Sequence, residues 1–493
     1  MNLSKSKYCE GITCLKKLWL ELYKKEEATN INESVLENGT EVGELARNLF
    51  GKHINIEYDS NLDNMVKQTK KVLEENDNVV VTEASFNYNN NFCSVDILVK
   101  RDDGYIIYEV KSSTEVKDIY IEDISYQYYV LSELGYSVFA TCIVTINPSY
   151  VREGELDLNK LFIINDATYF VFNNYDRVIS NIDYINKNIT DKEPNIQLGK
   201  YCKKPYDCPY FNYCTKDLEK PNIFDIKDMK FDTKLKLYKE QLISFKELLS
   251  TKINPKYKEQ VEFELYDKEP KINKEYIKDF LDTISYPIYF LDFETYQEAI
   301  PSYDGIKPYM QIPFQYSLHI LYEDGTLEHK EFLSESGIDP RRKLAEQLVK
   351  DIPLNSCTMA YNMSFEKTRI KELANLFPDL KEHLLNINDN MVDLMIPFYK
   401  RNYYTKEMQG SYSIKYVLPA LFPNDPELDY HNLPVVHKGD EASAAFINLK
   451  NLSKEEQEKV RNGLLVYCGL DTYAMVKIYE KLLEVTNNKH IKK

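Results

Sequence analysis

Histidine, tryptophan and long apolar runs are scarce in this sequence of 493 residues. It contains seven scattered histidines and one tryptophan. Scattered histidines are more often surface or core residues than metal ligands, so a histidine-based metal centre is not expected. No apolar stretch approaches the ~18 residues of a membrane-spanning helix, and the opening residues MNLSKSKYCEG contain no apolar signal segment. We therefore expect a cytoplasmic protein without a membrane partner.

Positive charge is also in deficit. Lys and Arg number 62 against 78 Asp and Glu, which gives a formal net charge of −16. This balance argues against broad, non-specific binding of nucleic acid, but it allows a local basic groove beside an acidic site. The apolar share of 43% and the charged share of 28% are ordinary for a globular chain. The length suits two or three domains.

Three regions differ in their residue pattern. Residues 1–217 combine helical stretches with a meander of strands, whose breaks are an Asn-rich loop and an Asp-Gly turn. Residues 218–285 are rich in Lys, Glu and Leu with helical periodicity, which indicates a helical linker. Residues 286–493 begin again with strands and end in a long helix at 454–485. The sequence therefore predicts an α/β protein with two globular domains and a helical linker.

A first group of charged residues lies on the strand YIIYEVKSS. Glu109 and Lys111 share one of its faces, because strand side chains alternate. The Asp-Asp-Gly loop before it leaves two registers open, one with Asp96 opposite Glu109 and one with Asp96 opposite Lys111. Both registers place the three residues on one face. Glu83, on the preceding strand, joins them if the Asn-rich loop is tight.

This group suits phosphodiester hydrolysis. Carboxylates hold Mg²⁺ or Mn²⁺ through hard oxygen ligands. Such an ion polarises the scissile phosphate, while Lys111 orients a water molecule or neutralises developing charge. The alternative is a solvated sheet edge with ordinary salt bridges.

The nine cysteines are not expected to form disulfides in a chain without an export signal. Cys202, Cys208 and Cys214 follow a C-x5-C-x5-C spacing among prolines and aromatics, which is typical of a loop. Four thiolates suit zinc or an iron–sulphur cluster, and the spacing is not the short C-x2-C pair usual for zinc. A fourth thiol must come from elsewhere, with Cys14 and Cys9 as candidates. The alternative is a set of core cysteines without metal.

A second group of acids begins in the apolar run YFLDFETY. Asp292 and Glu294 share one face of a strand that fits the centre of a sheet, and buried carboxylates need a compensating partner. Glu366 lies in the first turn of a predicted helix, and Tyr467 and Asp471 share one face of the last helix. Four acids can hold two divalent ions roughly 4 Å apart on a phosphodiester, with Tyr467 positioning a water molecule. Taken alone, Glu366 is also explained as an acid favoured by the helix dipole.

The first group resembles the PD-(D/E)xK nuclease superfamily, and most closely its RecB-like and CRISPR-associated iron–sulphur nucleases. The resemblance implies a metal site formed by Asp96 and the Glu109-x-Lys111 triplet. It also implies a catalytic Gln127, from a helical Gln-x3-Tyr motif in which Leu131 replaces the Tyr.

The same resemblance implies a [4Fe–4S] cluster held by one cysteine before the nuclease core and three after it. Cys14 stands at the first position, and Cys202, Cys208 and Cys214 stand at the other three. The upstream His of these nucleases is missing, and Gly43 occupies its apparent position.

The second group resembles the DEDD exonucleases of the RNase H-like fold, in their Tyr-type subclass. The motifs are Asp-x-Glu, Asn-x2-Phe-acid and Tyr-x3-Asp. The resemblance implies metal binding by Asp292, Glu294, Glu366 and Asp471, with Tyr467 catalytic; their sequence positions follow the order of the family motifs. Glu366 replaces the usual Asp.

An auxiliary acid of these relatives is matched by Asp393, a reserve ligand. The stretch PFQYSLHIL resembles a bacterial family of uncharacterised proteins that joins such a domain to an iron–sulphur nuclease domain, and this resemblance covers most of the chain, including both acid groups and the cysteines.

A candidate strand-binding segment is FYKRNYYTK, residues 398–406, which interleaves basic and aromatic residues. Together these features predict a metal-dependent nuclease that acts on nucleic acid, with DNA favoured over RNA and RNA left open. Two alternatives remain open. One is a single active domain whose companion only binds the strand, and the other is a non-catalytic nucleic-acid-binding scaffold.

Overall fold

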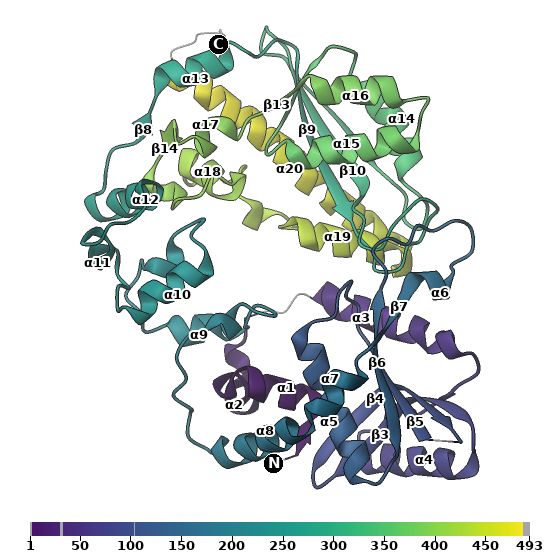
Figure 1. Cartoon of the computed structure of the whole chain (residues 1–493). Helices are drawn as coiled ribbons and strands as arrows, with labels where there is room; N and C mark the ends of the chain where they lie inside the picture. The colour runs from purple at the N-terminus through teal and green to yellow at the C-terminus, as the bar shows by residue number, and fades with distance from the viewer. Residues whose placement is uncertain (1, 30–32, 103, 487–493) are drawn as a thin grey trace. The chain divides into compact units, whose positions relative to one another are not determined.

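The computed structural model describes residues 2–29, 33–102 and 104–486, and the chain divides into two compact units. Unit 1 comprises Met1–Leu218 and Glu298–Tyr309, and unit 2 comprises Glu219–Gln297 and Met310–Lys493. The mixed α/β class predicted from the sequence is confirmed in both units (Figure 1).

Unit 1 is built on a mixed seven-stranded sheet in the order β2-β3-β4-β5-β6-β7, with β1 parallel to β4. The strands are β1 (Leu3–Ser4), β2 (Ile54–Asn55), β3 (Val79–Tyr88), β4 (Asn91–Arg101), β5 (Gly104–Val110), β6 (Val138–Ile146) and β7 (Phe162–Asp166). The helices are α1 (Lys5–Thr13), α2 (Leu15–Tyr23), α3 (Glu33–Ala46), α4 (Leu62–Glu75), α5 (Asp118–Glu133), α6 (Leu158–Leu161), α7 (Thr168–Asn173), α8 (Tyr175–Asn188) and α9 (Phe211–Thr215).

A tight turn joins β3 to β4. Tyr88 pairs with Asn91, and the two residues between them, Asn89 and Asn90, have φ values of 47° and 66°. A two-residue hairpin loop with positive φ at both positions is typical of a type I′ turn, and Asn tolerates this conformation. The Asn-rich loop is therefore tight, as the sequence analysis required for Glu83 to face the next strand.

The register of β4 and β5 settles which alternative holds for Asp96. Arg101 pairs with Gly104 and Ile97 with Tyr108, so continuing the ladder by one residue sets Asp96 opposite Glu109. This is the first of the two predicted registers. The loop residue Asp103 lies outside the described residues.

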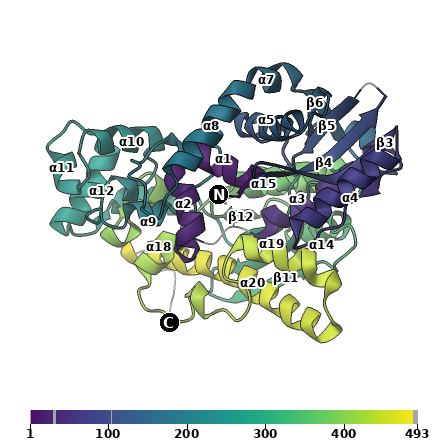
Figure 2. The same cartoon turned by 90° about the horizontal axis from the view of Figure 1, so that it is seen from below.

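Apolar clusters cover both faces of this sheet. The helices α5 and α7 lie beside β6, α8 packs against α5 and α7 (Figures 1 and 2), and α1 and α4 contribute to the same cluster. The second cluster contains residues of α3 and also Ala299, which is fully buried. The Tyr309 hydroxyl donates to the Ser112 carbonyl over 2.8 Å. Segment 298–309 thus belongs to unit 1, although the predicted division placed it in the second domain.

Unit 2 is built on a five-stranded sheet in the order β11-β10-β9-β12-β13. Its strands are β9 (Ile288–Tyr296), β10 (Ile312–Leu321), β11 (Leu327–Leu333), β12 (Cys357–Ala360) and β13 (Met391–Asp393), and β8 (Lys271–Ile272) pairs separately with β14 (Tyr403–Tyr404). The helices are α10 (Phe231–Lys239), α11 (Phe245–Leu249), α12 (Pro255–Tyr266), α13 (Lys274–Leu281), α14 (Arg341–Asp351), α15 (Ser364–Leu376), α16 (Lys381–Asp389), α17 (Ile396–Tyr399), α18 (Ile414–Leu421), α19 (Gly439–Asn448) and α20 (Lys454–Val485).

The central strand β9 is antiparallel to β10 and parallel to β12. Its residues Ile288 and Phe290 pack in a cluster with α20, whereas Tyr289, Leu291 and Phe293 pack in a cluster with α14, α15 and α16 (Figure 1). The alternation of strand side chains therefore sends Asp292 and Glu294 to the α20 side. The predicted central position of this strand is confirmed.

The stretch predicted as a helical linker, 218–285, does contain the helices α10 to α13. These helices are grouped with unit 2, and Ile277 and Leu281 of α13 are buried in the same apolar cluster as α20. Among the described residues, no helix is both long and apolar enough to cross a membrane.

Candidate metal centres

Four acids from three elements of unit 2 come together. Asp292 and Glu294 lie on the face of β9 that α20 covers, Asp471 lies on α20, and Glu366 lies in the first turn of α15. Asp471, Glu294 and Glu366 all act electrostatically on Asp292, so the four carboxylates share one centre.

Burial and mutual repulsion raise the pKa values of these acids. Burial is the largest cause in each case, and the pKa values of Asp292 and Glu294 rise well above their usual range. The pKa of Glu366 rises to about 8, with Asp393 adding to the effect of burial. The pKa of Asp471 rises to about 6, although a hydrogen bond from a tyrosine opposes the shift. A bound cation would stabilise the charged forms that burial disfavours.

Glu366 carries an acceptor that no group of the described residues satisfies. Its side chain is buried, and its Oε2 atom has no hydrogen-bond partner in that part of the chain. In the described part of the chain, no Lys or Arg nitrogen lies within 4.0 Å of a carboxylate oxygen of the four acids. The donor set therefore fits hard divalent ions, which take carboxylate oxygens as ligands.

The turn before α15 determines where Glu366 lies. Asn362 adopts a left-handed φ of 68°, and its backbone N–H donates to Asp393 over 2.9 Å. The N–H groups of Met363 and Met395 also donate to this carboxylate, over 3.3 and 2.9 Å. Asp393 therefore holds the turn that presents Glu366, a different role from that of the reserve ligand implied by the resemblance.

Two residues of this centre were not found from the sequence. The Tyr430 hydroxyl donates to Asp471 Oδ1 over 2.6 Å, and its ring centroid lies 5.9 Å from that of Tyr467. The sulfur of Cys468 lies 3.9 Å from Asp292 Oδ2, and the ligand atoms of Asp292, Glu294 and Cys468 all lie within 4.8 Å of one another. Cys468 is buried and borders the acids, which its local sequence did not indicate.

A pocket of about 930 Å³ borders this centre within unit 2. Tyr430, which contacts Asp471, lines it together with the basic Lys415 and Lys438 and the apolar Phe422. Basic groups beside an apolar wall suit the phosphate and the base of a nucleotide.

In unit 1, four polar side chains form a closed network. Lys111 Nζ donates to Glu109 over 2.7 Å and to Asp123 over 2.6 Å. Gln127 Nε2 donates to the same two acids, over 2.7 and 3.1 Å. The predicted Glu109, Lys111 and Gln127 are thus brought together, with Asp123 as a member that the sequence did not reveal.

Asp96 and Glu109 are joined by a second lysine from the start of the chain. Lys5 Nζ lies 3.3 Å from Asp96 Oδ1 and 3.1 Å from both oxygens of Glu109. Burial would lower the pKa of Lys5, but the neighbouring acids hold it well above its usual range. The other oxygen of Asp96 accepts the Val110 N–H over 2.7 Å.

Three further positions considered in the sequence lie outside this network. Glu83 pairs with Arg47 over 2.8 Å, although the register sets it across from Asp96. Leu131 is fully buried in the apolar core. Gly43 stands where the resemblance expects a His, and a Cβ added there would meet no atom of the described residues within 4 Å.

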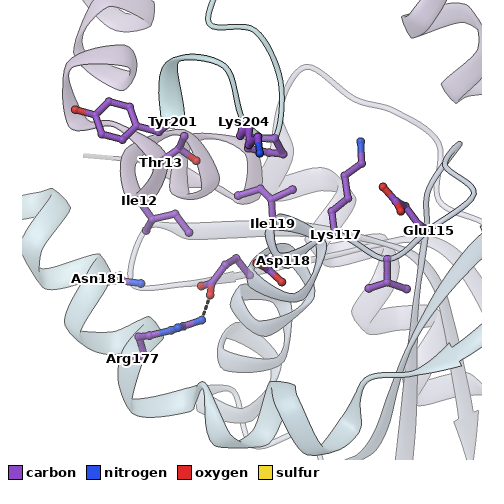
Figure 3. A pocket seen from close by; sticks show the side chains of 13 residues that line it. Ile12, Thr13, Glu115, Lys117, Asp118, Ile119, Arg177, Asn181, Tyr201 and Lys204 are labelled. Atoms are coloured by element: carbon purple, nitrogen blue, oxygen red, sulfur yellow. Dashed lines mark ion pairs between the residues drawn. The ribbon is translucent and has the colours of Figure 1, made fainter. Parts of the chain in front are cut away.

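Two neighbouring pockets of unit 1 share Thr13, Lys117 and Tyr201 among their lining residues, and their volumes are about 940 and 650 Å³. Figure 3 shows the first, with Arg177 paired to Glu122 on α5. The second reaches the Lys111–Asp123 pair, and Lys117 stacks over the ring of Tyr206, 4.4 Å from its centroid. The pockets therefore extend from the polar network to the cysteine-bearing loop.

The four predicted cysteines Cys14, Cys202, Cys208 and Cys214 line one small cavity of about 20 Å³. Cys9 does not line it and lies instead beside Lys111, so the structure favours Cys14 as the fourth thiol.

The spacing of these thiols bears on which group they fit. No three of their Sγ atoms, all within the described residues, lie within 4.8 Å of one another. Four cysteine thiolates lining one cavity can hold either a zinc ion or an iron–sulphur cluster.

Segment 398–406 was predicted to bind a nucleic-acid strand with exposed aromatic rings, and most of these rings are not exposed. Phe398, Tyr403 and Tyr404 are buried in the core of unit 2, and Arg401 donates to the Gly410 carbonyl. Buried rings cannot stack on bases, and Tyr399 alone of the four aromatic residues is exposed, so the segment offers one ring instead of the expected aromatic platform.

Comparisons with known proteins match part or most of the chain. Residues 289–413, which include Asp292, Glu294 and Glu366, match a family model described as "Domain of unknown function (DUF2779)". The chain is similar to "Uncharacterized protein UU173" of Ureaplasma parvum serovar 3, with 22% identity over 584 aligned positions, covering 89% of this chain and 84% of the relative. Neither description states an activity.

Proposed function

We propose that this protein is a Mg²⁺- or Mn²⁺-dependent nuclease, with an exonuclease centre in unit 2 that degrades DNA from 3′ ends. The observation that carries the proposal is the meeting of four acids to which no cationic side chain of the described residues is ion-paired, together with a buried oxygen on Glu366 that has no hydrogen-bond partner among those residues. The central position of β9 in a mixed five-stranded sheet supports an RNase H-like fold for this unit.

In this proposal each residue of unit 2 has a defined task. Asp292, Glu294, Glu366 and Asp471 hold two divalent ions, which supply charge stabilisation to the attacking and leaving oxygens of the phosphodiester. Tyr467 orients the attacking water. Tyr430 keeps Asp471 in place through its hydrogen bond, and the adjacent pocket receives the terminal nucleotide.

For unit 1 we propose a PD-(D/E)xK fold with its own centre at Asp96, Glu109, Lys111 and Gln127, tied together by a [4Fe–4S] cluster on the four cysteines. The convergence of Cys14 with the three later cysteines supports the cluster. The carboxylates of this centre are already paired with lysines: Glu109 with Lys5 and Lys111, and Asp123 with Lys111. This pairing supports the alternative in which unit 1 binds the strand and unit 2 cuts it.

The deciding experiment is degradation of 5′-labelled and 3′-labelled single-stranded DNA with Mg²⁺ or Mn²⁺, with matched RNA alongside. Asp292→Asn is expected to abolish the ladder that begins at the 3′ end, while Asp379→Asn, an exposed acid of the same unit, leaves it intact. Lys111→Met tests unit 1. Intact DNA and RNA with both metals would contradict the proposal, and a purified protein that is colourless and holds stoichiometric zinc would contradict the cluster.

A further inference from the structure

Unit 1 places an ammonium group between the two acids expected to hold its metal. The position of Lys5 is fixed by its backbone, because it is the first residue of α1 and directly follows β1. Leu3 and Ser4 pair with Asn91 and Phe92 of β4, and the Ser4 hydroxyl accepts the Lys7 N–H in the first turn of α1. The pairing of β1 with β4 therefore fixes the backbone of Lys5 close to β4.

The hydrogen-bonding capacity of Glu109 is filled by protein groups. Its two oxygens accept two contacts from Lys5, one from Lys111 and one from Gln127, over 2.7 to 3.1 Å. An ionised carboxylate offers about four lone-pair sites. A divalent ion would have to replace at least one of these donors.

The two centres of the chain differ sharply in charge. In unit 1, Asp96, Glu109 and Asp123 face Lys5 and Lys111, which leaves roughly one uncompensated negative charge. In unit 2, no Lys or Arg among the described residues is ion-paired with the four acids, and Lys415 acts on Glu294 and Asp471 only from beyond 4.0 Å. A buried carboxylate cluster needs compensation, and unit 1 supplies it from its own chain.

We propose that Lys5 is a built-in counter-ion that occupies the cation position between Asp96 and Glu109, so that a divalent ion binds in unit 1 only after Lys5 is displaced. The inference rests on the proposed metal site of unit 1. Its consequence is that unit 1, with Lys5 in place, holds a strand without cutting it.

The test is Mn²⁺ binding to the full chain, measured as the loss of the EPR signal of the free ion. All variants also carry Asp292→Asn, which weakens Mn²⁺ binding at the centre of unit 2. Lys5→Met keeps the length of the side chain and removes its charge. We expect this variant to bind one additional Mn²⁺ per chain with an affinity raised about tenfold or more. Lys7→Met, on the same helix, is the matched control and should change nothing. Asp96→Asn, added to Lys5→Met, should remove the new site.

The outcomes separate this inference from the proposed function. Equal Mn²⁺ affinity at unit 1 with and without Lys5 would overturn the counter-ion while leaving the metal site standing. Absence of Mn²⁺ binding in both forms would overturn the metal site of unit 1, and the inference with it. If Lys5→Met melts at a lower temperature because the acids lose their partner, Mn²⁺ should restore the melting temperature, and failure to do so counts against the proposal.

Discussion

At the scale of single residues, two buried glutamates show how partners decide what a carboxylate can do. Glu109 is 1% exposed and is surrounded by donors, whereas Glu366 is 4% exposed and has one oxygen without a partner. A satisfied acid stabilises the fold as it stands, while an unsatisfied one costs ~1–3 kcal/mol until a ligand arrives. The two residues are therefore suited to different tasks.

Glu366 should make the metal-free protein less stable as the pH rises. Its folded pKa of about 8 lies above its usual value of 4.5, so the unfolded state ionises first. Stability should be greatest below pH 4.5 as far as this group is concerned, and should fall between pH 4.5 and 8. Each pKa unit corresponds to ~1.4 kcal/mol, so the total loss is a few kcal/mol.

Glu366→Gln removes the titrating group, and in EDTA we expect it to flatten the pH dependence of the melting temperature of unit 2 and to stabilise that unit at pH 8. Glu382→Gln, at an exposed position on α16, is the control. A melting temperature in EDTA that depends on pH equally in native and Glu366→Gln protein would contradict the assignment.

Cys468 should make the centre of unit 2 sensitive to soft metal ions. Its sulfur lies beside Asp292 and Glu294, and thiolates prefer Zn²⁺ to Mg²⁺. Zn²⁺ should therefore compete with Mg²⁺ for this centre. Cys468→Ser should weaken Zn²⁺ binding about tenfold or more. Cys357→Ser is the control and should leave Zn²⁺ binding unchanged. Calorimetric titration of Zn²⁺ into protein whose cluster cysteines are already loaded measures this, and equal Zn²⁺ affinities would remove the thiol from the site.

At the scale of elements, turn chemistry made the strands and their register predictable. The Asp-Asp-Gly loop restricted Asp96 to two positions, and β4 and β5 adopt one of them. The last helix was also predicted at its observed bounds, because its pattern is long and continuous. Lys5, Asp123 and Tyr430 could not be predicted, because nothing in their local sequence indicates which distant acids they meet.

Burial explains why the prediction of a strand-binding segment at 398–406 failed. The run 398–406 has the composition of a strand-binding surface, but the tertiary packing of unit 2 turns three of its four aromatic rings inward and leaves only that of Tyr399 exposed. Basic and aromatic residues alternate there without showing which face is solvated. Composition alone could not distinguish a stacking platform from a core segment.

Segment 298–309 should stabilise unit 1, although it follows β9 of unit 2 in the sequence. Ala299 is fully buried among apolar residues of the α3 side of the unit 1 sheet. Ala299→Asp places a charge there and should lower the stability of unit 1 by at least ~2 kcal/mol. Lys307→Asp, at an exposed position of the same segment, is the control. The measurement is the denaturant midpoint of the unit 1 transition, followed by circular dichroism, and an unchanged midpoint would remove the segment from the core of unit 1.

At the scale of the whole molecule, the two units divide the handling of charge. Each has its own sheet and its own apolar clusters. The net charge of −16 is borne by a chain whose unit 1 neutralises most of its central acids internally and whose unit 2 does not. The response to divalent ions should therefore differ between the units.

Calorimetry should resolve this as two unfolding transitions, of which Mg²⁺ or Mn²⁺ raises only that of unit 2. A ligand that binds only the folded state at 100 times its Kd adds ~2.7 kcal/mol, which corresponds to a shift of several degrees. Cys208→Ser should lower the other transition and so identify it as that of unit 1. Asp292→Asn should cancel most of the shift caused by Mg²⁺. A native chain in which Mg²⁺ raises both transitions equally would show that unit 1 also binds the ion with Lys5 in place, and that the charge balance of its centre does not keep divalent ions out.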